Sequence, residues 1–77
     1  MTKLIQMKTL VFKTNVQKSS DIEVLEYSLN KTANNVHWNF DLEDCDKILR
    51  IETDQNISQN IITLMNRQGF FCEELQD

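Results

Sequence analysis

The sequence contains no proline and a single glycine among its 77 residues. Flexible linkers and disordered tails are usually rich in such residues, so we expect one ordered domain spanning residues 1–77. No apolar run is longer than three residues, as at residues 10–12. This pattern argues against a membrane-spanning helix and against a secretory signal peptide, and it makes the cytoplasm the expected location.

Positive charge is also scarce. Eight Lys and Arg residues face twelve Asp and Glu residues, for a net charge of −4. This balance argues against a nucleic-acid binder, which must neutralise phosphates, and against binding to anionic membranes. Because we expect a reducing compartment, Cys45 and Cys72 are predicted to be free thiols.

Alternating apolar and polar residues identify the clearest strand, at residues 36–43. Such alternation is typical of a strand with one buried and one solvated face. The inward positions are Val36, Trp38, Phe40 and Leu42. A polar stretch at residues 43–47 follows, and strand character resumes at residues 48–52 with Leu49 and Ile51 facing inward. Two strands joined by about five polar residues predict a hairpin.

Helical spacing flanks this hairpin on both sides. Ile22, Leu25 and Leu29 predict an amphipathic helix, and the capping box at residues 20–23 places its start near Ser20. The second helix is predicted from Ile61, Leu64 and Met65, with Ser58 as its candidate cap and Gly69 as its left-handed C-terminal residue.

A first strand through Leu10 and Phe12, starting near Ile5, and a short last strand at residues 70–75 complete the order βαββαβ. A four-stranded antiparallel sheet with both helices on one face buries every apolar face once, so we predict an α+β, ferredoxin-like fold. The predicted core comprises Phe12, Ile22, Leu25, Leu29, Val36, Trp38, Phe40, Leu49, Ile51, Ile61 and Met65.

Residues 13–29 match much of a known motif, which reads Gly-Met-Thr-Cys-x-x-Cys followed by apolar, apolar, Glu and Leu positions. The matching positions are Val16, Ile22, Leu25, Glu26, Leu29 and the pair Gly69-Phe70. The chain thus resembles the heavy-metal-associated domain of copper chaperones and of the tails of metal-pumping ATPases. Residues 38–41 and 46–49 are similar to a bacterial subgroup of that family. The resemblance covers nearly the whole chain and implies the same βαββαβ fold.

Lys18 and Asp21 stand at the two metal-ligand positions of this motif, where the family has cysteines. A protonated amine cannot ligate and repels a cation, while a carboxylate is a poor ligand for soft Cu(I). We therefore expect no metal and no cofactor by the family route. An ion pair between Lys18 and Asp21 is one alternative. We favour the other interpretation, in which Asp21 interacts with the positive end of the helix dipole, because exposed ion pairs contribute only about 0–1 kcal/mol.

A relocated metal site is a second hypothesis. Cys45 lies between Asp44 and Asp46 at the hairpin tip, and the predicted topology places Cys72 at the same pole of the sheet. The two cysteines belong to opposite halves of the sheet, however, and a buried free cysteine behaves as a small apolar residue. The sequence therefore favours a chain without metal, with Cys45, Cys72, Asp44 and Asp46 as the alternative ligands.

No catalytic constellation is visible, since His37 is the only histidine and has no nearby nucleophile. We expect a non-catalytic docking or regulatory module with a protein partner; the alternative is a metal chaperone or buffer using Cys45 and neighbouring acids. The expected partner surface is the open face of the sheet, and the family resemblance also implies docking through the helices and the end of the domain that carries the metal-binding loop. Alternation assigns to that open face Val11, Lys13, His37, Asn39, Asp41, Ile48, Arg50 and Glu52.

Overall fold

The computed structural model describes residues 7–32 and 37–76, which form strands and helices in the predicted order. The elements are β1 (Lys8–Thr14), α1 (Ser19–Thr32), β2 (His37–Asp41), β3 (Ile48–Thr53), α2 (Ser58–Arg67) and β4 (Cys72–Leu75). The predicted positions Ile5 and Val36 lie outside the described residues. The last strand is shorter than predicted, because it begins at Cys72 and not at Phe70.

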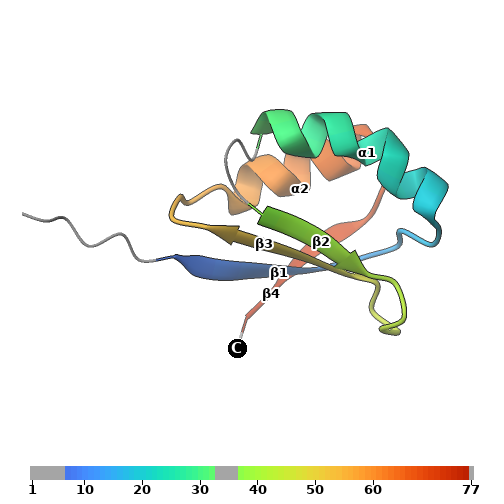
Figure 1. Ribbon diagram of the computed structural model, residues 1–77, viewed down its shortest axis with the longest axis horizontal. Coiled ribbons are helices and arrows are strands. Elements are labelled where there is room, and N and C mark those ends of the chain that lie inside the picture. The colour runs from blue at the N-terminus through green and yellow to red at the C-terminus, as the bar shows by residue number, and fades with distance from the viewer. Residues whose placement is uncertain (1–6, 33–36, 77) are drawn as a thin grey trace, which may run out of the picture.

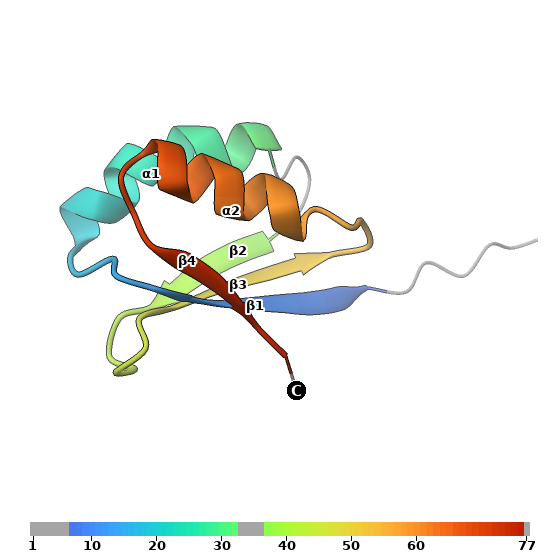
Figure 2. The same cartoon turned by 180° about the vertical axis from the view of Figure 1, so that it is seen from behind.

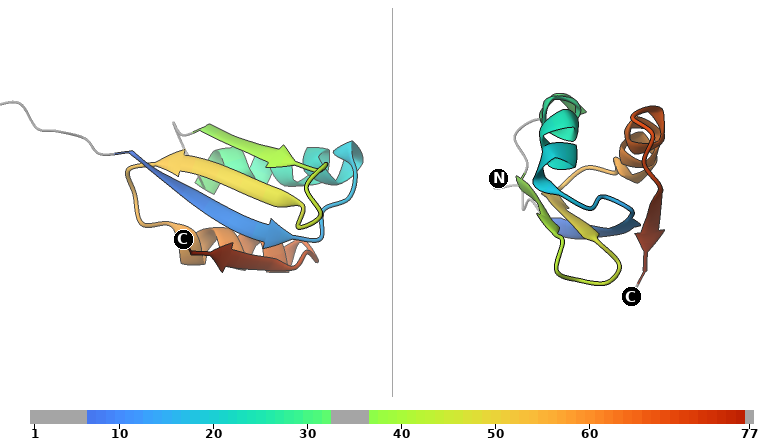
Figure 3. Two further views of the ribbon diagram at one scale, coloured as in Figure 1. Left: turned by 90° about the horizontal axis from the view of Figure 1, so that it is seen from below. Right: turned by 90° about the vertical axis from the view of Figure 1, so that its right-hand side faces the viewer.

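The four strands form one antiparallel sheet in the order β2-β3-β1-β4. Both helices cover the same face of the sheet (Figures 1 and 2), and the view from below shows the other face without helices (Figure 3). We call this second face the open face. The arrangement confirms the predicted α+β, ferredoxin-like fold.

The core lies between the sheet and the helices, and most of its predicted members are buried there. Those with no exposed surface are Phe12, Leu25, Leu29, Leu49, Ile51, Ile61 and Met65. Ile22, Trp38 and Phe40 are only partly buried and pack against this cluster. Trp38 lies on the edge strand β2, and its Nε1–H donates to Asn30 Oδ1 of α1 at 2.7 Å. It therefore covers the margin of the core instead of occupying its centre.

α1 starts within one residue of the predicted position near Ser20, but its cap differs from the prediction. The helix begins at Ser19, and the Lys18 carbonyl accepts hydrogen bonds from Asp21 N–H at 3.0 Å and Ile22 N–H at 3.4 Å. Lys18 thus takes the capping position, and the prediction of a cap at Ser20 is wrong. The Asp21 carboxylate instead reaches back and accepts Gln17 N–H at 3.2 Å, which satisfies a backbone donor just before the helix.

At α2 one boundary was predicted wrongly and the other correctly. Ile57 is the N-terminal cap and no side chain caps the helix, so Ser58 is its first residue instead of the cap. At the C-terminus Gly69 has φ +90, a left-handed conformation that costs glycine nothing. Its N–H donates to Asn66, and Phe70 N–H donates to Met65 at 2.9 Å, which together form a Schellman motif.

The open face exposes less apolar surface than alternation predicted. Ile48 lies on this face but is only 4% exposed, so it is no part of an exposed apolar surface. Its register neighbours are Lys13 on β1 and Asp41 on β2. Lys13 pairs with Asp46 at 3.7 Å, and Asp41 pairs with Arg50 at 3.8 Å. The stems of such long side chains shield apolar neighbours from water, which accounts for the buried isoleucine.

Candidate functional site

Three connections meet at one end of the sheet, on the right in Figure 1 and facing the viewer on the right of Figure 3. They are residues 15–18 between β1 and α1, residues 42–47 between β2 and β3, and residues 68–71 between α2 and β4. We call this end the loop pole. The sequence predicted that these segments share one pole, and the hydrogen bonds among them confirm it.

Thr14, at the end of β1, ties the hairpin tip to the sheet. Its side chain is 5% exposed, and Oγ1–H donates to the Lys47 carbonyl at 2.6 Å. The same oxygen accepts Val16 N–H at 3.2 Å, while the backbone N–H of Thr14 donates to the Asp46 carbonyl at 3.1 Å. One buried residue therefore fixes both the tip and the start of the loop that leads to α1.

Asn15 ties the start of the last strand to the loop that follows β1. Its Oδ1 accepts the backbone N–H of Phe71 at 2.9 Å, one residue beyond the last register pair, Thr14 with Cys72. The Phe71 side chain itself is 48% exposed. The loop pole thus presents a large aromatic ring on a backbone whose position is fixed by a side-chain hydrogen bond.

The hairpin tip is also held from within. Lys47 has a left-handed backbone with φ 50, and its Nζ donates to the Leu42 carbonyl at 2.7 Å. Its N–H donates to the Asp44 carbonyl at 3.0 Å, and Asp46 N–H donates to Asp44 Oδ1 at 2.8 Å. A non-glycine residue persists in this conformation only when its surroundings impose it, so these contacts define one tip geometry.

Lys18 and Asp21, which replace the family's cysteines, lie at the first loop as the motif implies. Lys18 is exposed and immediately precedes α1, and Asp21 lies in the first turn of that helix. Within residues 7–32 and 37–76 the two side chains form no ion pair, so the alternative of a lysine paired with Asp21 is not realised. The helix-dipole interpretation of Asp21 fits its observed position.

The structure brings three of the four alternative metal ligands together. Asp44, Cys45 and Asp46 each offer one ligand atom, and these atoms lie within 4.8 Å of one another. Cys72 does not belong to this cluster. It pairs with Thr14 from β4, on one side of β1, whereas β3 and the hairpin tip lie on the other side.

Cys72 behaves as a core residue. Its side chain is 8% exposed and belongs to the apolar cluster. Burial, together with the negative charge of Glu74, raises the pKa of the Cys72 thiol to about 12. The thiolate, which is the form that binds metals, is therefore scarce at neutral pH. Cys45, by contrast, is an exposed thiol at the tip.

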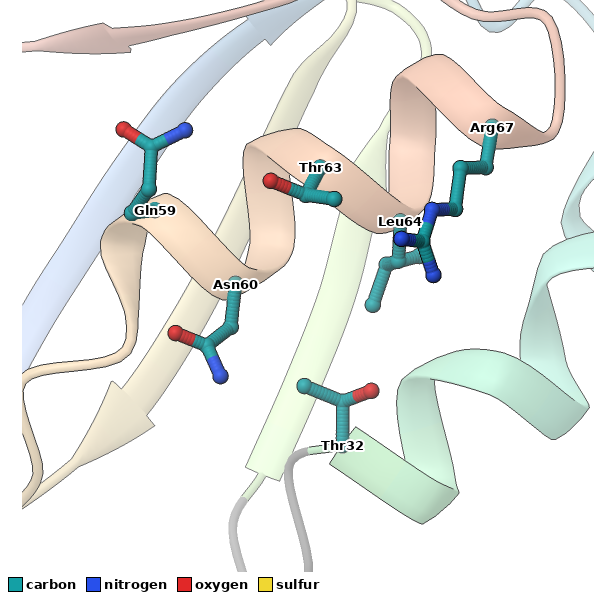
Figure 4. A pocket seen from close by; sticks show the side chains of 6 residues that line it. All are labelled: Thr32, Gln59, Asn60, Thr63, Leu64 and Arg67. Carbon is teal, nitrogen blue, oxygen red and sulfur yellow. The ribbon is translucent and has the colours of Figure 1, made fainter.

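A hollow of about 370 Å³ lies between α2 and the end of α1, away from the predicted site residues (Figure 4). Its lining residues are Thr32, Gln59, Asn60, Thr63, Leu64 and Arg67. Arg67 is the only ionisable residue among them, so this lining supplies no pair of groups for acid–base chemistry. The loop pole remains the better candidate site.

Sequence reasoning missed the two residues that assemble the loop pole. Thr14 and Asn15 stand at a strand end followed by a polar loop, which is ordinary for surface residues. Their partners lie 33 and 56 positions away in the chain. The sole local sign of a buried role is that Thr14 alternates in phase with Leu10 and Phe12, on the strand face that points toward the helices.

Comparison with family models, with curated proteins and with solved structures finds no match to this chain. The resemblance to the heavy-metal-associated family therefore stays a prediction carried by its motif positions. Among the described residues no helix is both long enough and apolar enough to cross a membrane.

Proposed function

We propose that this protein is a non-catalytic docking or regulatory module that binds a protein partner through the loop pole. The observation that carries the proposal is Phe71, half exposed on a backbone fixed by Asn15. Exposed aromatic anchors dominate the energetics of many protein interfaces. A surface that is already ordered loses less conformational entropy when it binds.

The charge of the loop pole specifies the kind of partner. Glu43, Asp44 and Asp46 make the hairpin tip acidic, whereas Lys18 is an exposed cation of the first loop. Lys13 pairs with Asp46, and Lys47 Nζ donates to a backbone carbonyl. A partner with an apolar pocket for the aromatic ring and a basic rim complements this surface.

Phe71→Ser tests the docking proposal, with Tyr27→Ser as the matched control. Tyr27 is 74% exposed on α1 and takes no part in the loop pole, so both variants remove one exposed aromatic ring. A partner recovered from native extract by wild type and by Tyr27→Ser is then titrated calorimetrically. Phe71→Ser should weaken its binding by about thirtyfold, equivalent to about 2 kcal/mol. Equal binding by both variants refutes docking through this pole.

The docking proposal includes no metal at the first loop, because Lys18 and Asp21 stand where the family has its two cysteine ligands. Reduced wild-type protein should retain no Cu(I) against a strong competing chelator. The double variant Lys18→Cys with Asp21→Cys should retain one equivalent, since it restores both thiolates at the start of α1. Tight Cu(I) binding by wild type contradicts the loss of the site. A double variant that binds no Cu(I) shows that the loop does not follow the family geometry.

A second candidate function is metal binding at the hairpin tip, favoured by the convergence of Asp44, Cys45 and Asp46. One thiolate with two carboxylates suits a borderline ion such as Zn(II) better than Cu(I). Native mass spectrometry of reduced protein with Zn(II) or Cd(II) tests it, with Cys45→Ser as the control. One bound ion that Cys45→Ser loses supports the candidate, and binding that survives in Cys45→Ser removes it.

A further inference from the structure

The two edges of the sheet differ in how they are protected. β2 and β4 are the edge strands, and within the described residues no further strand pairs with either of them. Exposed edges are normally blocked by proline, lysine or a bulge. The sequence of β2, HWNFD, has no proline, glycine or lysine, and its pairing with β3 runs without interruption from His37 to Asp41.

β4 is protected by charge. Its sequence is CEEL, and antiparallel pairing of two such strands about their centre places Glu73 of one copy opposite Glu74 of the other. Directly opposed like charges destabilise a strand pair. The edge of β4 therefore opposes self-pairing, while the edge of β2 has no comparable device.

The sequence of β2 is complementary to itself when two copies run antiparallel about Asn39. Asn39 then faces Asn39 of the second copy, and His37 faces Asp41 at both ends of the pair. Trp38 faces Phe40, twice, on the side of the helices. Imidazole–carboxylate and aromatic–aromatic pairs are favourable across strands. We propose that the protein forms a symmetric dimer in which the outer edges of two β2 strands pair and join the two sheets.

The edge residues are already positioned for this contact. Trp38 and Phe40 stack edge to face with ring centroids 6.0 Å apart, and Asn30 holds the indole in place. The Asp41 carboxylate accepts Glu43 N–H at 3.2 Å and lies 3.8 Å from Arg50. Because the side-chain period of a strand is two, a slip by one residue places aromatic residues against the polar row and is disfavoured. A slip by two residues keeps the aromatic rows opposed but separates His37 from Asp41.

The size of the edge limits the affinity of this dimer. β2 has five residues, so the strand pair and the adjoining flank of α1 form a small interface. Contacts below about 1,200 Å² are typical of weak complexes, and we therefore expect dissociation at low micromolar protein and association toward millimolar protein. The dimer contact uses the outer edge of β2, whereas Phe71 precedes β4 at the opposite edge of the sheet, so the dimer is independent of docking through Phe71.

The residue on the two-fold axis gives a decisive test, because it meets its own copy. Asn39 is exposed, so charge can be introduced without disturbing the core. Asn39→Asp and Asn39→Lys each place like charges opposite one another and should both be monomeric. Their equimolar mixture should restore a heterodimer. Sedimentation velocity from micromolar to millimolar protein measures association, and native mass spectrometry identifies the mixed species. Far-ultraviolet circular dichroism confirms that both variants fold.

Thr9→Lys on β1 is the control, since it adds a charge at an exposed position of an interior strand, away from both sheet edges, and should leave the dimer intact. A wild-type protein that stays monomeric at millimolar concentration overturns the proposal. So does a dimer that survives both Asn39 variants, or a mixture that forms no heterodimer. Open-ended assemblies, which result when β2 of one copy pairs with β4 of the next, also contradict it.

Discussion

Replacing Thr14 by valine should loosen the loop pole while leaving the core packed. Valine has nearly the shape of threonine but neither donates nor accepts a hydrogen bond. The change therefore leaves the Lys47 carbonyl and the Val16 N–H without the partners they have at 2.6 and 3.2 Å. An unsatisfied buried polar group costs about 1–3 kcal/mol, and the Lys47 carbonyl is only partly shielded. We expect Thr14→Val to lower the free energy of unfolding by about 2–4 kcal/mol.

Thr53→Val is the matched control for this substitution. Thr53 is fully buried at the end of β3, and its Oγ1 accepts one hydrogen bond, from Gln55 N–H at 3.0 Å. With a single bond lost, Thr53→Val should cost about 1 kcal/mol. Denaturant unfolding followed by the fluorescence of Trp38, the sole tryptophan, measures both variants.

Hydrogen exchange separates a local effect from a global one. Amide exchange at Val16 and Lys47 should accelerate in Thr14→Val beyond what its lower stability explains, and should not do so in Thr53→Val. The docking proposal further requires Thr14→Val to bind the partner more weakly than Thr53→Val does. A Thr14→Val protein within about 0.5 kcal/mol of wild type refutes the idea that this hydroxyl assembles the pole.

Three further predictions follow from the burial pattern. Phe12→Ala should lower the free energy of unfolding by about 3–5 kcal/mol and Trp38→Ala by about 3 kcal/mol or less, since only Phe12 is fully buried. Denaturant unfolding measures both variants, and equal losses of stability would place Trp38 in the centre of the core. Cys45 should react quickly with a thiol reagent, and Cys72 only on unfolding, as measured by the labelling rate of each single-cysteine variant; equally fast labelling contradicts this. The pKa of the Cys72 thiol is about 12 in the folded protein and near 9.0 in the unfolded chain, so wild type should lose stability relative to Cys72→Ala as the pH rises between these values. If the stabilities of the two proteins fall in parallel with pH, the raised pKa of Cys72 is ruled out.

The sequence was sufficient for the fold because its patterns are local. The alternation from residue 36 onward placed Trp38 and Phe40 on the correct face, and helical spacing found Leu25 and Leu29 with no exposed surface. Helix starts were less predictable. Any of several neighbouring residues can provide the first carbonyl, and at α1 the backbone of Lys18 took the place expected of Ser20.

Alternation also could not predict burial on the open face. It gives the direction of a side chain but not what covers it, and Ile48 is covered because charged residues on both neighbouring strands lie beside it. For the site, topology brought the correct segments to one pole and separated Cys45 from Cys72. The contacts that fix Phe71 depended on Asn15, 56 positions away, and no local pattern specifies such a partner.

The hydrogen bond between Asn15 and Phe71 has a consequence for when the protein can be recognised. It joins the loop after the first strand to the residue before the last one, so its closure requires nearly the whole chain to be in place. Contacts of such long sequence separation form late, because loop closure must be offset by other native interactions. A nascent or partly unfolded chain can form the hairpin of β2 and β3 and still present no ordered aromatic anchor. Under the docking proposal, a partner that binds at this pole would select chains whose folding is finished.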